Sequence, residues 1–120
     1  AQLVTINAAT TGVITLNAAT IAADYSDTAA NLVAAFAGIT THTGTLTATG
    51  ATTVTQANAL DTVSAGVVTA TIDGTATSLA TLSGTTGDYT ITLTAGAAAA
   101  TLAQLVTINA ATTGVITLNA

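Results

Sequence analysis

The sequence predicts a solenoid in which short strands and helices alternate and the strands stack into a parallel sheet. Two observations lead to this prediction. Residues 1–18 return without change as residues 103–120, which places an internal repeat at an offset of 102 positions. Thr supplies 31 and Ala 29 of the 120 residues, and Thr alternates with aliphatic residues in several runs, as expected for strands with one buried face.

The exact repeat has two interpretations. The chain is a window on a tandem array of period 102, or it is a subunit that carries the same strand at both ends and exchanges it end to end. Both interpretations make further copies of the same sequence, covalently joined or meeting end to end, the expected partner. Lateral self-association of such arrays is also expected.

A weaker repeat divides one period into four units, each ending at a glycine after a polar turn. The units cover residues 13–44, 45–66, 67–87 and 88–114, and open with the runs VITLN, TLTAT, VVTATI and DYTITLT. Each run is followed by a turn and a short Ala/Leu-rich segment with helical spacing. The expected helices cover residues 26–36, 55–63, 77–82 and 97–105, with Ser26 or Asp27 as the cap of the first. This cycle is typical of coils like those of leucine-rich repeats or parallel β-helices.

Alternation assigns each strand residue to a face of the sheet. The positions expected to face inward are Leu46, Ala48, Val68, Ala70, Ile72, Ile91, Leu93, Ile116 and Leu118. Those expected to face outward are Thr45, Thr47, Thr49, Thr69, Thr71, Thr90, Thr92, Thr94, Val115, Thr117 and Asn119. The three aromatic residues, Tyr25, Phe36 and Tyr89, are expected to fill the core of coils otherwise lined with alanine.

Composition excludes several functions. The chain has no Lys or Arg, five Asp and a net charge of −5, so it offers no cationic surface to nucleic acid or to anionic membranes. No run of apolar residues is long enough to enter a membrane as a helix. Without Cys, neither disulfides nor thiolate metal sites can form. No arrangement of residues indicates catalysis, and we expect no enzyme activity.

One candidate metal site remains. Asp24 and Asp27 stand three residues apart before the first expected helix, and two carboxylates with turn carbonyls could bind Ca²⁺. The simpler interpretation is capping of that helix, and no other cofactor is expected. Asp61, Asp73 and Asp88 are isolated and are expected to keep the surface hydrated and to cap turns. His42, in the sequence TTHTG, is expected to be a surface turn residue, because nothing in the sequence places a Ser and an acid beside it.

The segment SDTAANL (26–32) and the run from Ala48 to Ile72 resemble repeats of very large secreted bacterial proteins, cyanobacterial and proteobacterial, that are often described as hemolysin-like or calcium-binding. The resemblance implies an extracellular or cell-surface location. It carries over no catalytic residue, and the acidic glycine-rich nonapeptides of calcium-binding β-rolls are absent from this chain.

The sequence therefore predicts a structural repeat protein of an extracellular fibre, sheath or surface-layer filament. Two alternatives remain open. The rows of outward Thr residues could bind ice as a regular lattice of hydroxyl groups, or the array could be the spacer stalk of a large adhesin.

Overall fold

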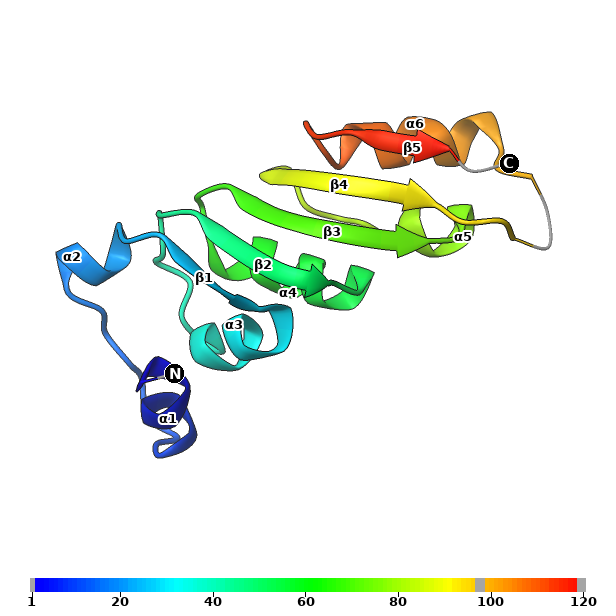
Figure 1. Cartoon of the computed structure of the whole chain (residues 1–120). Coiled ribbons are helices and arrows are strands. Elements are labelled where there is room, and N and C mark those ends of the chain that lie inside the picture. Colours follow the sequence, from blue (N-terminus) through cyan, green and yellow to red (C-terminus); the bar gives the residue numbers. More distant parts are fainter. Residues whose placement is uncertain (1, 97–98, 119–120) are drawn as a thin grey trace.

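A computed structural model describes residues 2–96 and 99–118. It contains a five-stranded parallel sheet whose strands lie side by side in chain order (Figure 1). The strands are β1 (Tyr25–Thr28), β2 (Leu46–Ala51), β3 (Val68–Gly74), β4 (Gly87–Leu93) and β5 (Ile116–Leu118). The helices are α1 (Gln2–Ala8), α2 (Ala18–Ile21), α3 (Ala29–Phe36), α4 (Val54–Val63), α5 (Ala76–Leu79) and α6 (Leu102–Ala110).

Each pair of neighbouring strands is joined by one helix, and the helices α3 to α6 follow one another along one side of the sheet (Figure 1). Parallel strands need such crossovers, and their constant handedness places successive helices on the same face. The described chain measures 46 × 21 × 20 Å. The parallel sheet with interleaved helices confirms the coarse architecture predicted from the sequence.

Threonines start the four helices α3 to α6. Thr28, Thr53, Thr75 and Thr101 are the N-caps of α3 to α6, and each side-chain oxygen accepts a hydrogen bond from the backbone N–H three residues on. At Thr53 and Thr101 the backbone N–H of the cap donates in turn to the side-chain oxygen of a glutamine three residues later, which completes a capping box. The cap of α3 is therefore Thr28, and the prediction of Ser26 or Asp27 as its cap is wrong.

The inward face of the sheet is largely as predicted. Six of the expected inward residues are buried: Leu46, Ala48, Val68, Ala70, Ile72 and Ile91. Leu93 and Ile116 are half-buried, and Leu118 is 61% exposed because β5 is an edge strand of the sheet. Phe36 and Tyr89 are buried in the core as predicted, whereas Tyr25 is half-buried. The expected outward Thr residues are exposed or half-buried, and Asn119 lies outside the described residues.

Four predictions of local structure are wrong. The helix expected at 77–82 covers Ala76–Leu79. Residues 13–17 form no strand, although the identical residues 115–119 include β5, and the first strand is instead Tyr25–Thr28. The helix expected at 26–36 begins at Ala29, because residues 25–28 are held as a strand by β2. The helix expected at 97–105 covers Leu102–Ala110, and residues 97 and 98 lie outside the described part.

Candidate functional site

The two carboxylates proposed as calcium ligands each bind backbone or amide donors. Asp24 Oδ1 accepts a hydrogen bond of 2.7 Å from the backbone N–H of Thr45, next to β2. Asp27 Oδ1 accepts one of 2.7 Å from Thr28 N–H and one of 2.8 Å from the Asn31 side-chain amide. The Asn31 amide, and after it the Thr28 N–H, hold the pKa of the Asp27 carboxyl below its usual value. Each carboxylate thus has a structural role of its own.

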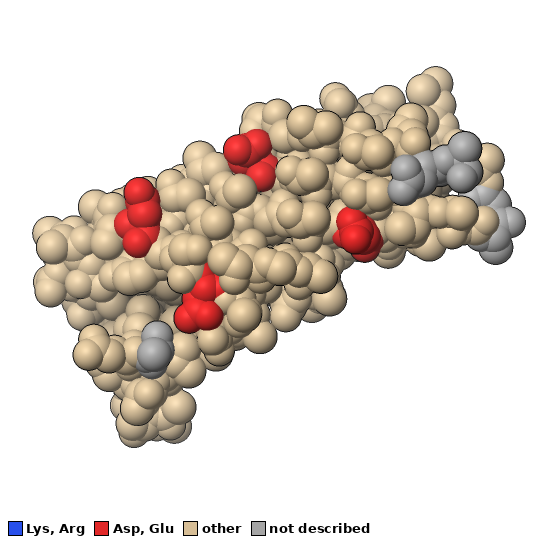
Figure 2. All heavy atoms as spheres, in the orientation of Figure 1, with Lys and Arg blue, Asp and Glu red and all other residues tan. Residues whose placement is uncertain are grey.

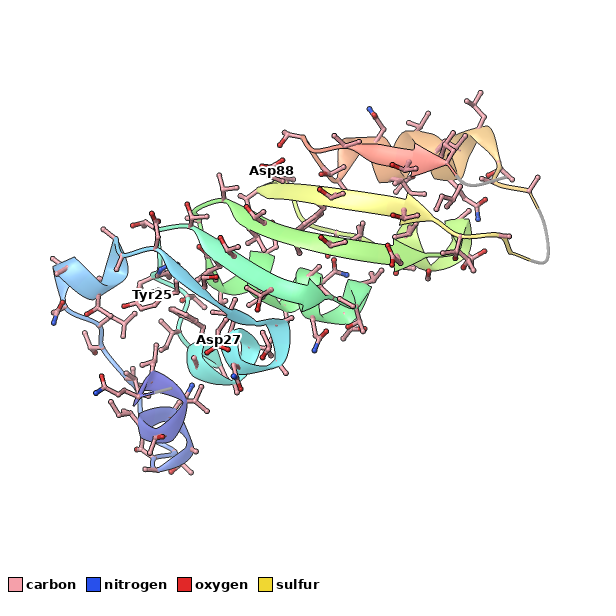
Figure 3. The ribbon with its side chains drawn as sticks, viewed as in Figure 1. Tyr25, Asp27 and Asp88 are labelled. Atoms are coloured by element: carbon pink, nitrogen blue, oxygen red, sulfur yellow. The ribbon has the colours of Figure 1, made fainter. Side chains whose placement is uncertain are left out.

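The acidic side chains do not gather. Figure 2 shows them separated from one another on the face in view, and Figure 3 places Asp27 on β1 and Asp88 at the start of β4. Asp61 holds the turn before β4, because its Oδ1 accepts hydrogen bonds from Thr86 N–H and from the Thr86 hydroxyl. Within residues 2–96 and 99–118, no three His, Cys, Asp or Glu side chains form a group that could hold a metal ion. Calcium binding at Asp24 and Asp27 stays a hypothesis.

His42 is fully buried, so its prediction as a surface turn residue is wrong. Its Nε2 lies 2.9 Å from the Ala23 carbonyl oxygen and its Nδ1 lies 3.0 Å from Ser64 Oγ. Because a carbonyl oxygen only accepts, Nε2 donates to the Ala23 oxygen, and Ser64 Oγ is the hydrogen-bond partner of Nδ1. The imidazole also packs against Phe36 and Tyr25, with ring centroids 4.7 and 5.6 Å away.

A serine hydrogen-bonded to a histidine is the arrangement of an activated nucleophile, but this pair is enclosed. Ser64 is 5% exposed, and its Oγ is also bonded to Gly66 N–H at 3.1 Å and lies 3.2 Å from the Gly44 carbonyl oxygen. The other imidazole nitrogen faces a carbonyl where a catalytic triad has a carboxylate. The pair therefore joins the turn before β2 to the turn before β3, and we assign it a structural role.

A turn motif that sequence reasoning missed underlies this pair. Ser64 and Thr112 each stand two residues before a glycine, and each hydroxyl oxygen accepts a hydrogen bond from that glycine's N–H. Thr112 Oγ1 is also bonded to the backbone N–H and C=O of Tyr89 on β4. His42, two residues before Gly44, takes the corresponding position in the first turn. The signal in the sequence is the shared position of HTG, SAG and TTG before successive strands, which makes His42 and Ser64 equivalent residues of neighbouring turns.

Two buried hydroxyl groups of the described residues, those of Thr52 and Tyr89, have no hydrogen-bond partner. Burial, and secondarily the nearby Asp61 carboxylate, raises the pKa of Tyr89 to about 12. Tyr89 thus fills the core with its ring while its hydroxyl contributes no hydrogen bond.

Two concave, largely apolar surfaces lie at the two ends of the sheet. A cavity of about 390 Å³ lies between α1 and the α3–β1 surface, lined by Leu3, Val4, Tyr25, Leu32 and Phe36 among others. At the other end an open groove of about 390 Å³ is lined by Leu105, Val106, Asn109, Ile116 and Leu118. We call this second surface the end groove. No helix of the described chain is long and apolar enough to cross a membrane.

Comparison of the chain with protein-family models, curated proteins and solved structures finds no match.

Proposed function

We propose that this protein is a structural repeat protein that builds an extracellular fibre, sheath or surface-layer filament. The observation that carries the proposal is the strand order β1-β2-β3-β4-β5, in which every strand is parallel to the one before it. Such a sheet lengthens by one strand with each strand–helix unit, and an order of this kind leaves an edge at each end for further units.

The register supports a solenoid as the form of this growth. Tyr25 lies opposite Leu46, Leu46 opposite Val68, and Val68 opposite Gly87, so the chain returns to the same level of the sheet after about one strand–helix unit each time. Each unit is then one coil, and unequal coil lengths are absorbed in the turns. A thin, alanine-rich core is sufficient, because each coil buries its apolar surface against the next coil.

The rest of the molecule fits a structural role. The buried His42–Ser64 pair and the carboxylates of Asp24, Asp27 and Asp61 all hold turns or strand ends in place. The resemblance of residues 26–32 and 48–72 to repeats of giant secreted bacterial proteins supports an extracellular location.

Electron microscopy of the purified chain over a range of concentrations tests the proposal. We expect filaments whose diffraction shows a reflection along the fibre axis at ~4.8 Å, because strands of a solenoid stack along its axis. A chain that stays monomeric at about 1 mM, the range of effective concentrations that linked repeats experience, contradicts assembly as the function. Antibody labelling of intact cells tests the location, and labelling only after lysis contradicts it.

Ice binding is a second candidate, because the outward face carries paired Thr residues. Thr47 lies opposite Thr69, Thr71 opposite Thr90, and Thr92 opposite Thr117. The rows are interrupted where Asp88 lies opposite Thr69 and Asp73 opposite Thr92. Thermal hysteresis that is lost in Thr71→Tyr, in the outward row, and kept in Thr62→Tyr, on helix α4, supports ice binding. Freezing without hysteresis or shaped crystals excludes it.

A further inference from the structure

The two identical segments make different contacts in the same molecule. We call residues 1–18 the N-duplicate and residues 103–120 the C-duplicate. In the N-duplicate α1 packs against α3, and the Asn7 side-chain nitrogen lies 3.0 Å from each of the carbonyl oxygens of Ala34, Ala35 and Ala37. In the C-duplicate α6 packs against α5, and β5 pairs with β4. The same sequence thus packs on two different surfaces.

These two surfaces cover opposite faces of the segment. Ile6 is 53% exposed, but its equivalent Ile108 is 1% exposed. Leu16 is 8% exposed, but its equivalent Leu118 is 61% exposed. The segment therefore has two binding faces, and each duplicate has only one of them covered.

The end groove is the uncovered face of the C-duplicate. Its lining residues are Leu105, Val106, Asn109, Ile116 and Leu118. The equivalent residues of the N-duplicate already have partners: Asn7 binds the end of α3, and Leu3, Val4, Ile14 and Leu16 pack with the hydrophobic core. Because residues 2–8 and their equivalents 104–110 are both helical, the α3 surface that receives Leu3, Val4 and Asn7 also has the contacts and hydrogen-bond acceptors to receive Leu105, Val106 and Asn109.

We propose that the end groove binds the α3–β1 surface of a second copy of this chain, replacing that copy's own N-duplicate. Asn109 then donates to the carbonyl oxygens at the end of the second copy's α3, as Asn7 does within one chain. The C-duplicate becomes covered on both faces, by α5 and β4 of its own chain and by α3 and β1 of the next. This inference rests on the proposed function and gives it a defined interface.

The interface joins two different surfaces, so each chain contributes its end groove to one neighbour and its α3–β1 surface to the other. Such a heterologous contact forms open chains when its rotation does not close, which suits a filament. The N-duplicate of the same chain competes for the α3–β1 surface, and its effective concentration there is about millimolar or higher. The cavity between α1 and the α3–β1 surface indicates that the N-duplicate covers this surface incompletely. Wild-type chains are therefore expected to associate only when concentrated, and loosening the N-duplicate should favour association.

One isosteric substitution at equivalent positions tests the inference. Asn7→Asp replaces an amide donor with a carboxylate against three carbonyl oxygens at the negative end of α3, which loosens the N-duplicate. Asn109→Asp makes the same change at an exposed residue of the end groove. The two variants have the same net charge, so a general charge effect acts on both alike.

Sedimentation analysis of wild type, both single variants and the double variant gives the readout, with circular dichroism confirming that each is folded. We expect Asn7→Asp to lower the concentration for association at least tenfold, and Asn7→Asp/Asn109→Asp to stay monomeric. Where Asn7→Asp does not fold, Asn7→Ala replaces it in both arms.

Association of the double variant equal to that of the single Asn7 variant overturns the inference. A monomeric, folded Asn7→Asp overturns it as well. If wild type still forms filaments in either case, the proposed function stands and only this interface is wrong. If no variant associates at any concentration, both fail.

Discussion

Ser64 Oγ lies 3.0 Å from His42 Nδ1, although 22 positions separate the two residues in the chain. Both side chains are buried, and the backbone reinforces the contact, because Ala65 N–H donates to the His42 carbonyl oxygen at 2.8 Å. The contact ties two successive turns at the beginning of the sheet, beside the Tyr25–Phe36–His42 aromatic cluster. In a chain without Lys or Arg, contacts of this kind replace salt bridges as links between units.

Ser64→Ala should destabilise the fold. It leaves a buried imidazole nitrogen and the Gly66 N–H without their shared partner, at a cost of about 1–3 kcal/mol in the free energy of unfolding. Chemical denaturation measures the loss. Ser83→Ala is the control, because the Ser83 side chain is exposed, and it should change stability by about 0.5 kcal/mol or less. Equal effects of the two substitutions contradict the assigned role of the pair.

Tyr89→Phe should preserve the fold at neutral pH. The Tyr89 hydroxyl is buried without a hydrogen-bond partner, so its removal avoids a desolvation cost, and stability should stay within about 1 kcal/mol of wild type or rise. A loss above about 2 kcal/mol in a denaturant titration would reveal a hydrogen bond to the hydroxyl.

Stability should fall at high pH because of the same residue. Burial raises the folded-state pKa of Tyr89 from 10.0 to about 12, so above pH 10 the unfolded chain releases a proton that the folded chain retains. Stability is therefore independent of Tyr89 ionisation below pH 10, and it falls as the pH rises from 10 to about 12, because the folded chain resists forming the buried phenolate. The chain has no Lys, Arg or Cys, which leaves few other side chains to titrate in this range. Melting temperatures should drop less steeply in Tyr89→Phe, and parallel curves for the two proteins contradict the assignment.

The central strands could be predicted from the sequence because their alternation matches their surroundings. Residues of β2, β3 and β4 have neighbouring strands on both sides and helices on one face, so aliphatic residues point inward and Thr outward. β1 escaped prediction because its sequence YSDT contains poor strand formers, and pairing with β2 makes it a strand.

The two duplicates show the limit of local prediction most directly. ITL forms β5 at residues 116–118 and no strand at 14–16, so only the presence of β4 beside the segment decides its structure. The roles of Asp24 and Asp27 depend in the same way on Thr45, Thr28 and Asn31. The burial of His42 depends on a serine 22 positions away, which the spacing of turns indicates only after alignment of the units.

The cap of α4 can be tested inside a single helix. Thr53→Ala removes the side-chain half of the capping box, in which Thr53 Oγ1 accepts from Gln56 N–H, and should cost about 1 kcal/mol in the free energy of unfolding. Thr55→Ala lies two residues on, at an exposed position within α4, and should be neutral or slightly stabilising because Ala is the better helix former. Urea denaturation of both variants measures the difference, and a more stable Thr53→Ala would contradict the capping role.

Calcium should have little effect on stability. Asp24 Oδ1 and Asp27 Oδ1 already accept hydrogen bonds that fix β1 and α3. The two carboxylates share no donor, because Asp24 binds Thr45 N–H and Asp27 binds Thr28 N–H and the Asn31 amide. Extracellular calcium modules bind at about 1 mM Ca²⁺. The melting temperature in about 1 mM CaCl₂ should therefore equal that in NaCl of the same ionic strength. A saturable rise that disappears in Asp27→Asn would establish the calcium site.

The last prediction compares two glycines at equivalent positions of the duplicates. A Cβ atom on Gly114 would overlap the carbonyl oxygen of Tyr89, because the turn before β5 approaches β4 closely there. A Cβ atom on Gly12 would meet only Thr10 Oγ1, at 3.2 Å. Gly114→Ala should therefore displace β5 and expose Ile108, whereas Gly12→Ala should leave the fold nearly unchanged. Hydrogen exchange of the amides of residues 116–118 gives a direct readout, with protection lost in Gly114→Ala and kept in Gly12→Ala. Equal protection in the two variants would mean that β5 does not lie against β4 as described, because the two substitutions change the same amino-acid sequence and differ only in what that sequence contacts.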